Sequence, residues 1–391
     1  SMKNKISYPL TKENLSNSDI LQATNVLRSK NITMGKITLE IESFFKNKIV
    51  KSDSLMLNSG SSANLLIFQC LINPMCKKLK QGDEVLIPAI CWSTSLWPIV
   101  QSGLKPCFVD IDKTSLNICI EDLQKKITKK TKALMLVHAL GNCADMKKIQ
   151  NICKEKNIIL IEDTCEALGS KYKGKYLGTF GQFSSFSMYY SHHITSGEGG
   201  FVTTKNKKYL NILKTLRSHG WAKEVSSHKK DNWQFINSGF NLRPTDINAA
   251  IGLNQLKRLK KILNTRSQNY NLIVKSLLSD RRYNSQFAIT TSLKHNSIAW
   301  FGIPFVLSSK FSNKKNYIVN FLNKTGIETR PIISGNFANQ PAVKLYKIKA
   351  KNLKNANYIE KNAFFLGVHS KKLKIHELVF LKDGIFNSFK Q

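Results

Sequence analysis

Two adjacent histidines precede a glycine-rich turn in the stretch SHHITSGEGG, residues 191–200. Imidazole is the usual proton carrier near neutral pH, and glycines let a backbone approach a ligand closely. His192 and His193 are therefore candidates for acid–base chemistry. A metal site on this pair is not expected, because adjacent side chains diverge and no third ligand is evident. The stretch alone equally allows two polar residues of a surface loop.

A second candidate segment, LNSGSSANLL (residues 57–66), places small residues at an expected strand-to-helix turn. Gly60 allows an unusual backbone angle, and Ser61 and Ser62 open the helix. The free N–H groups and positive dipole end of such a helix can hold a phosphate. Turns of this composition also occur without any ligand.

Asp163 and Trp92 each follow a short apolar run that predicts a buried strand. Ligands of open α/β sheets bind at the carboxyl ends of the strands. Asp163 can pair there with a protonated ring nitrogen, or it can serve as a helix N-cap. The Trp92 indole can stack on a flat cofactor ring, or it can pack in the core or at an interface.

The elements that carry these residues follow from apolar runs that alternate with helical patterns. Strands are expected at 84–90, 105–111, 132–139 and 157–163, and a helix at 143–156. This alternation predicts an α/β fold with a mostly parallel sheet. One long helix is expected after Pro244, with apolar positions from 247 to 263. Runs at 300–309 and 327–333 predict strands of a second, smaller α/β domain. We therefore predict a large domain, residues 1–262, and a small C-terminal domain, residues 263–391.

The 391-residue chain has a formal net charge of +35, mostly from lysines spread along its length. Nucleic-acid binders concentrate arginines and aromatic residues on one element, so we expect no nucleic-acid partner. A positive surface also attracts a small phosphorylated substrate.

The eight cysteines contain no C-x-x-C pair and end at Cys165, which predicts reduced thiols and no zinc site. No apolar run reaches about 20 residues, and the first ten residues contain no apolar signal segment. We therefore expect a cytoplasmic protein without membrane insertion.

Six motifs occur in one order along nearly the whole chain: ITMGKITLEIESFF, NSGSSANLL, VHALGNCADM, EDTCEALGS, SGEGG and GFNLRPTDINAAIGLNQL. In order and spacing they resemble the fold-type I pyridoxal-phosphate enzymes that act on nucleotide-linked keto sugars. These are the sugar aminotransferases and their dehydratase relatives. The resemblance implies the fold-type I transferase architecture.

One position departs from the aminotransferase pattern. Family aminotransferases carry a lysine, which binds the cofactor covalently, five residues before the first glycine of the G-E-G-G turn. Five residues before Gly197 stands His192, whereas the usual serine is present as Ser187. An imidazole cannot replace the lysine as nucleophile, but it can move a proton. This exchange resembles the keto-sugar 3-dehydratase branch, which RSHGW (217–221) and IETRPIISGNFANQPA (327–342) also fit.

The resemblance implies a 3-dehydratase that removes the C3 hydroxyl of a nucleotide-linked 4-keto-6-deoxy sugar, in the synthesis of a surface polysaccharide sugar. The cofactor would be pyridoxal 5′-phosphate in its amine form, pyridoxamine 5′-phosphate, which L-glutamate regenerates. His192 is implied as the base, Asp163 as the partner of the ring nitrogen and Trp92 as the stacking residue. The other implied residues bind the cofactor (Gly60, Ser61, Ser62, Glu166, Ser187 and, across a homodimer interface, Asn241) or the sugar (His219 and Glu328).

Three rival functions stay open at this point. A sugar aminotransferase would need a lysine at the cofactor, and YYSHHITS contains none. An iron–sulfur 3-dehydratase also resembles this chain around His192, but its clustered cysteines lie downstream, where this chain has none after Cys165. A non-catalytic regulator would keep the fold and bind cofactor or nucleic acid, which the intact Asp163 and phosphate turn argue against.

Overall fold

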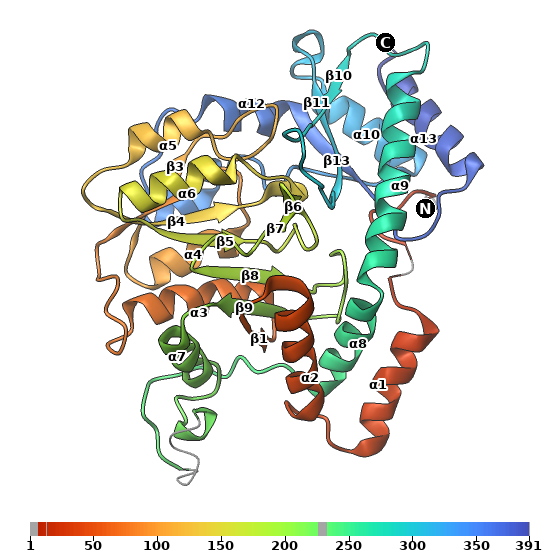
Figure 1. Ribbon diagram of the computed structural model, residues 1–391. Coiled ribbons are helices and arrows are strands. Elements are labelled where there is room, and N and C mark those ends of the chain that lie inside the picture. The colour runs from red at the N-terminus through yellow and green to blue at the C-terminus, as the bar shows by residue number, and fades with distance from the viewer. Residues whose placement is uncertain (1–6, 13, 226–232, 391) are drawn as a thin grey trace.

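A seven-stranded sheet organises the larger part of the chain (Figure 1) in the computed structural model, which describes residues 7–12, 14–225 and 233–390. Its strand order is β1-β9-β8-β5-β4-β2-β3, and β9 alone runs antiparallel to its neighbours. The strands are β1 (Asp53–Leu57), β2 (Glu84–Pro88), β3 (Lys105–Val109), β4 (Thr131–Val137), β5 (Ile159–Asp163), β8 (Phe183–Ser187) and β9 (Gly200–Thr204). The four strands expected in this region and the mostly parallel sheet are confirmed.

Helices cover both faces of this sheet, which explains why most residues of its strands are buried. Along β5, Leu160 packs into the core on one face and Ile161 into the core on the other. The face of Leu160 carries α5 (Ile120–Lys126) and α6 (Met146–Glu155), and the face of Ile161 carries α3 (Gly60–Ile72), α4 (Ser93–Gln101) and α7 (Lys207–Arg217). The predicted helix at 143–156 corresponds to α6.

The C-terminal part holds an antiparallel sheet of order β10-β11-β13-β12. Its strands are β10 (Phe287–Ile289), β11 (Gly302–Leu307), β12 (Thr329–Arg330) and β13 (Ala363–Gly367). They share a core with α9 (Leu259–Leu278), α10 (Lys315–Thr325) and α13 (Ile375–Ser388). Tyr8 joins this core, where its ring stacks on His369 and its hydroxyl donates to the Gly367 carbonyl at 2.9 Å. The predicted boundary after residue 262 falls inside α9.

The remaining elements lie outside these two sheets and the helices already named. They are α1 (Asn17–Ser29), α2 (Lys36–Phe44), the π-helix η1 (Phe45–Val50), the hairpin β6 (Lys171–Tyr172) and β7 (Lys175–Tyr176), α8 (Asp246–Lys257), α11 (Pro341–Leu345) and α12 (Lys354–Asn362). Short 3₁₀ turns lie at η2 (Ala139–Gly141), η3 (Ala222–Glu224), η5 (Ser309–Phe311) and η6 (Phe337–Asn339).

The prediction of one long helix after Pro244 is wrong, because the chain breaks between α8 and α9 at Arg258. Arg258 leaves helical geometry with φ −103° and ψ 5°. Its guanidinium binds both oxygens of the buried Asp19 carboxylate at 3.0 Å each. This fork-like pair ties the break to α1, so a tertiary contact overrides the helical periodicity.

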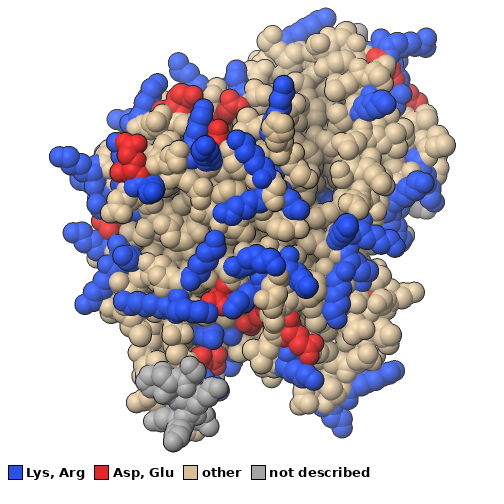
Figure 2. All heavy atoms as spheres, in the orientation of Figure 1, with Lys and Arg blue, Asp and Glu red and all other residues tan. Residues whose placement is uncertain are grey.

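Lysine and arginine side chains are spread over the whole face shown in Figure 2, with few acidic side chains between them. This matches the scattered lysines of the sequence and gives that face a positive potential. Within the described ranges, no helix combines the length and apolar character needed to cross a membrane.

Candidate active site

A cavity of about 500 Å³ lies where the carboxyl ends of the parallel strands meet the C-terminal part. Its volume is in the range of small-ligand pockets. The strand ends form one wall of the cavity. The C-terminal part contributes Phe301, Arg330 and Phe365 to its lining. Seven residues singled out from the sequence line this cavity, namely Gly60, Ser61, Trp92, Asp163, Glu166, Ser187 and His192.

The turn between β1 and α3 forms a tight anion cradle. Ser59 caps α3, because its hydroxyl accepts the backbone N–H of Ser62 at 3.0 Å. Gly60 lies so close to the next loops that an added Cβ would sit 2.8 Å from the Ser187 Cβ and 2.9 Å from the Cys165 sulfur. Gly60 and Ser61, the first residues of α3, line the cavity, and the free N–H groups at the start of a helix suit a phosphate.

Asp163 ends β5 and is buried, with its carboxylate fixed by three donors. Oδ2 accepts the Ser95 hydroxyl at 2.7 Å and the Asn64 amide at 3.1 Å. Oδ1 accepts the backbone N–H of Cys165 at 3.1 Å. This shell holds the carboxylate at one place on the cavity wall, where it can face a cationic ring nitrogen.

Trp92 and Glu166 complete the wall beside Asp163. The Trp92 side chain is 57% exposed and lines the cavity, so its flat indole is free to stack rather than packed in the core. Burial, with a contribution from the Asp163 charge, raises the pKa of Glu166 to about 8. At neutral pH Glu166 is therefore mostly a protonated acid that can donate a hydrogen bond.

His192 lies on the cavity wall, and burial lowers its pKa to about 4. Contacts with the backbone of Cys165 and Ser187 and the charge of Asp163 oppose that shift only in part. Its Nδ1 atom is buried and has no hydrogen-bond partner among the described residues. The imidazole is therefore neutral at pH 7 and has a nitrogen available for a proton.

Four of the residues implied by the resemblance lie outside the lining. The Ser62 hydroxyl instead donates to Asn58 at 2.5 Å. Asn241 and His219 lie together, because Arg243 donates to the Asn241 side chain at 3.1 Å and reaches the His219 ring at 3.3 Å. Glu328 pairs with the lining residue Arg330 at 2.5 Å. Their roles toward cofactor or sugar remain predictions.

Several lining residues were not predicted from the sequence. Asn64 and Ser95 sit inside motifs that were singled out, one turn after Gly60 and three residues after Trp92. Their spacing could have indicated that they share the helix face of those residues. Phe301 and Arg330 lie in predicted strands, but no periodicity indicated that these strands meet the large sheet at the cavity.

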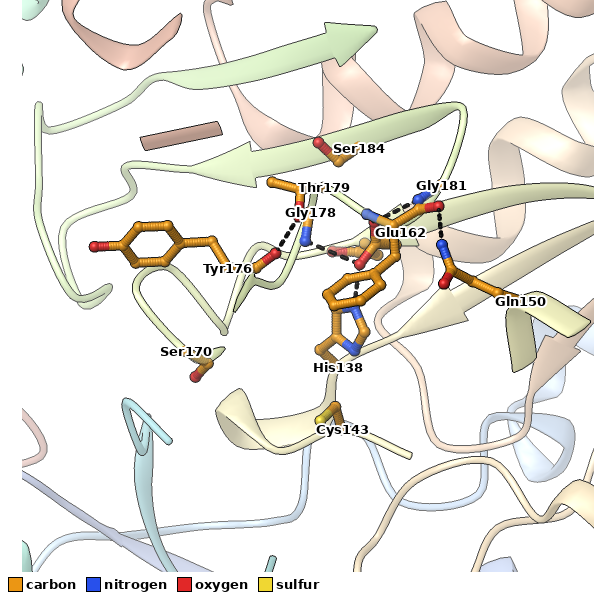
Figure 3. A network of polar contacts seen from close by, with 12 residues as sticks. His138, Cys143, Gln150, Glu162, Ser170, Tyr176, Gly178, Thr179, Gly181 and Ser184 are labelled. Carbon is orange, nitrogen blue, oxygen red and sulfur yellow. Dashed lines mark hydrogen bonds and ion pairs between the residues drawn. The ribbon is translucent and has the colours of Figure 1, made fainter. Parts of the chain in front are cut away.

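A buried polar network stabilises the strand ends behind the site (Figure 3). The Glu162 carboxylate accepts backbone N–H groups from Gly178, Phe180 and Gly181 at 2.8–2.9 Å, and His138 lies 2.9 Å from it. Because Glu162 and Asp163 are consecutive on β5, their side chains point to opposite faces of the sheet. The network thus fixes the strand that presents Asp163.

These residues fit a flat aromatic phosphate ester such as pyridoxamine phosphate. The cradle of α3 suits its phosphate, Trp92 its ring face and Asp163 its ring nitrogen. No lysine belongs to the lining within the described ranges, so the cavity wall offers no amine for a covalent bond. In the same part of the chain, no three His, Cys, Asp or Glu side chains gather as a metal site requires.

Comparisons with known proteins agree with this geometry. The model of the DegT/DnrJ/EryC1/StrS aminotransferase family matches residues 13–375. GDP-4-keto-6-deoxy-D-mannose 3-dehydratase of Escherichia coli O55:H7 is 34% identical, over 97% of this chain and 99% of that protein.

Solved structures give the same picture. The E. coli GDP-4-keto-6-deoxy-D-mannose-3-dehydratase with bound hydrated PLP is 35% identical, with a TM-score of 0.90, and the match covers 97% of this chain and all of that one. A GDP-4-keto-6-deoxymannose-3-dehydratase structure with a trapped PLP-glutamate geminal diamine is 34% identical, with the same TM-score and coverage. The chain belongs to the DegT/DnrJ/EryC1/StrS aminotransferase family, and the expected fold-type I architecture is confirmed.

Proposed function

We propose that this family member is a pyridoxamine phosphate-dependent 3-dehydratase of a nucleotide-linked 4-keto-6-deoxy sugar. L-Glutamate returns the amino group to the cofactor after each turnover. GDP-4-keto-6-deoxymannose is the first substrate to test, because it is named for relatives matched over nearly the whole chain. The observation that carries the proposal is the composition of the cavity wall, which contains Asp163, Trp92 and His192 but no lysine of the described chain.

The chain's own residues hold the cofactor and move protons. When bound, pyridoxamine phosphate supplies an amine for the C4 ketone of the sugar and a ring that accepts electrons. The N–H groups at the start of α3 and the hydroxyls of Ser61 and Ser187 hold its phosphate. Asp163 keeps the proton on the ring nitrogen, and Trp92 stacks on the ring.

His192 would act as the general base that moves the proton at the C4′ carbon of the bound cofactor, the proton transfer that loss of the C3 hydroxyl from the sugar requires. A base must be unprotonated in the resting state, and burial keeps His192 neutral. The charge of Asp163, which opposes the lowering of the His192 pKa, favours the imidazolium that forms. Glu166 keeps its own proton at neutral pH and donates a hydrogen bond into the cavity.

We further propose a cytoplasmic homodimer. Free thiols at all eight cysteines suit a reducing compartment. Ile20, Leu21 and Leu27 are exposed on α1 and offer an apolar face to a second copy. Asn241, which is exposed beside Arg243, would then reach the phosphate in the partner's cavity. Co-expressing His192→Asn and Asn241→Ala chains tests this arrangement, because one site of each mixed dimer would be intact and activity would return.

The proposed activity is tested by incubating the protein with cofactor, L-glutamate and a panel of nucleotide-linked 4-keto sugars. A 3-deoxy-4-keto product, detected by mass spectrometry, is expected from at least one member. His192→Asn should lower this turnover by about 10²–10⁴-fold while cofactor still binds. Asn substitution of the exposed His376 is the matched control. An amino sugar as the only product would contradict the proposal.

A further inference from the structure

The second histidine of the motif, His193, is buried and does not line the cavity. Its Nε2 atom lies 2.6 Å from the carbonyl oxygen of Ala299. A carbonyl can only accept, so His193 donates from Nε2. Burial and the charge of Arg266 hold its pKa well below the ordinary range. His193 therefore stays neutral and keeps this hydrogen bond throughout the physiological pH range.

The partner of His193 belongs to a firmly held segment, Ala299–Phe301, which leads into β11. The Ala299 N–H donates to Ser170 Oγ at 2.9 Å, and the Phe301 N–H donates to the Leu140 carbonyl at 2.9 Å. Arg266 donates to the Trp300 carbonyl at 2.9 Å. Each bond joins the segment to a different part of the fold, so its position is fixed.

The segment Ala299–Phe301 can lie this close to the turn after β4 only because residue 141 is a glycine. Gly141 has φ +90°, and an added Cβ would lie 2.4 Å from the Ala299 carbonyl oxygen. The carbonyl that His193 binds is thus packed directly against the 3₁₀ turn η2, which follows β4. A residue other than glycine at 141 would displace it.

The same segment forms the wall against His192. The Phe301 ring stands edge-on to the His192 ring, with centroids 5.2 Å apart and planes at 84°. It also contacts His193, with centroids 5.8 Å apart. His193 therefore anchors the histidine loop to Ala299, and His192 packs against the ring of Phe301 in the same segment.

We propose that His193 is a positioning residue, which ties the loop of the base to Ala299–Phe301 and thereby holds the His192 imidazole on the cavity wall. The inference rests on the proposed function, because it treats His192 as the base. A permanently neutral neighbour also leaves His192 free to take up a proton, whereas a cationic neighbour would oppose it.

The pair His193→Gln and His193→Leu separates positioning from packing. A glutamine amide nitrogen can occupy the place of imidazole Nε2 and donate to Ala299, whereas leucine fills space without a donor. We expect kcat of the leucine variant to fall about 10- to 100-fold with little change in KM, because a small misplacement of a catalytic group has effects of this size. The glutamine variant should recover most of this loss.

A second readout does not depend on turnover. Diethyl pyrocarbonate modification of His192, followed by peptide mass spectrometry of the protein as purified, reports how firmly the imidazole is held. The rate should rise severalfold in His193→Leu and stay near that of the natural chain in His193→Gln and in the exposed control His376→Leu. If His193→Leu does not fold, Ser170→Ala loosens the same segment from its other side and should also raise the rate.

The inference would be overturned if His193→Leu kept the kcat and the His192 modification rate of the natural chain. It would also be overturned if His193→Gln were as impaired as His193→Leu. The two failures are distinguishable. Should the natural chain lack dehydratase activity while the modification rates change as expected, the proposed function fails and the positioning role stands.

Discussion

Replacing Phe301 with alanine should move the pKa of the base. The Phe301 ring packs edge-on against His192 at 5.2 Å, and burial is the main cause that lowers the pKa of His192 to about 4. Removing the ring admits water to the imidazole, which favours its charged form. The pKa should therefore rise toward the ordinary value of about 6.5.

The size of the effect follows from the fraction of neutral base. At pH 5.5, an imidazole with a pKa of about 4 is roughly 97% neutral, whereas one with a pKa of about 6.5 is roughly 9% neutral. The natural chain should thus keep nearly the same kcat/KM between pH 7.5 and pH 5.5. The Phe301→Ala variant, at full return to the ordinary pKa, should lose about tenfold over that interval.

Two measurements check this prediction. The first is the pH profile of kcat/KM, with Phe311→Ala in the C-terminal part as the control that leaves the profile unchanged. The second is the titration of the His192 ring by NMR with labelled histidine, assigned by the His192→Asn variant. A midpoint near 6.5 in the natural chain would contradict this prediction, because it would show that the site does not desolvate the imidazole.

Three further predictions concern the cofactor. Gly60→Ala should weaken cofactor binding about 5- to 150-fold in a fluorescence titration, because the added methyl group would overlap Ser187 and Cys165 at a cost of about 1–3 kcal/mol. An unchanged affinity would contradict the role of the β1–α3 turn in binding the phosphate. After borohydride treatment and denaturation, the natural chain should show no added mass, whereas His192→Lys should gain a phosphopyridoxyl group. An adduct at an active-site lysine of the natural chain would contradict non-covalent cofactor binding. Purified without oxygen, the protein should hold no stoichiometric iron and should turn over with L-glutamate alone, because no cysteine follows Cys165; dependence on a reductase and NAD(P)H would favour the iron–sulfur alternative.

Residues at strand ends were the part of the site that the sequence could predict. Asp163, Trp92 and the turn at Gly60 each follow an apolar run, and parallel strands bring their carboxyl ends to one edge. The three partners of Asp163 were not predicted as partners. Ser95 comes from α4 and Asn64 from α3, and only the packing of these helices on the sheet brings them to one carboxylate.

Contacts between distant segments account for the rest. The break at Arg258 depends on Asp19, which lies on α1 far away in the sequence. Likewise the role inferred for His193 depends on Ala299, which local patterns did not relate to the histidine pair. Local propensity and periodicity describe neighbours along the chain, so they cannot indicate such pairs.

The fate of the glutamate nitrogen distinguishes a 3-dehydratase from an aminotransferase. The protein, with cofactor and the keto sugar that it accepts, is supplied with ¹⁵N-labelled L-glutamate, and the products are analysed by mass spectrometry. With a histidine in place of the lysine, we expect the label to leave as free ammonia, in step with 2-oxoglutarate and a 3-deoxy-4-keto sugar that carries no ¹⁵N. Label retained in the sugar as an amino group, with the C3 hydroxyl still present, would contradict the dehydratase function and identify an aminotransferase.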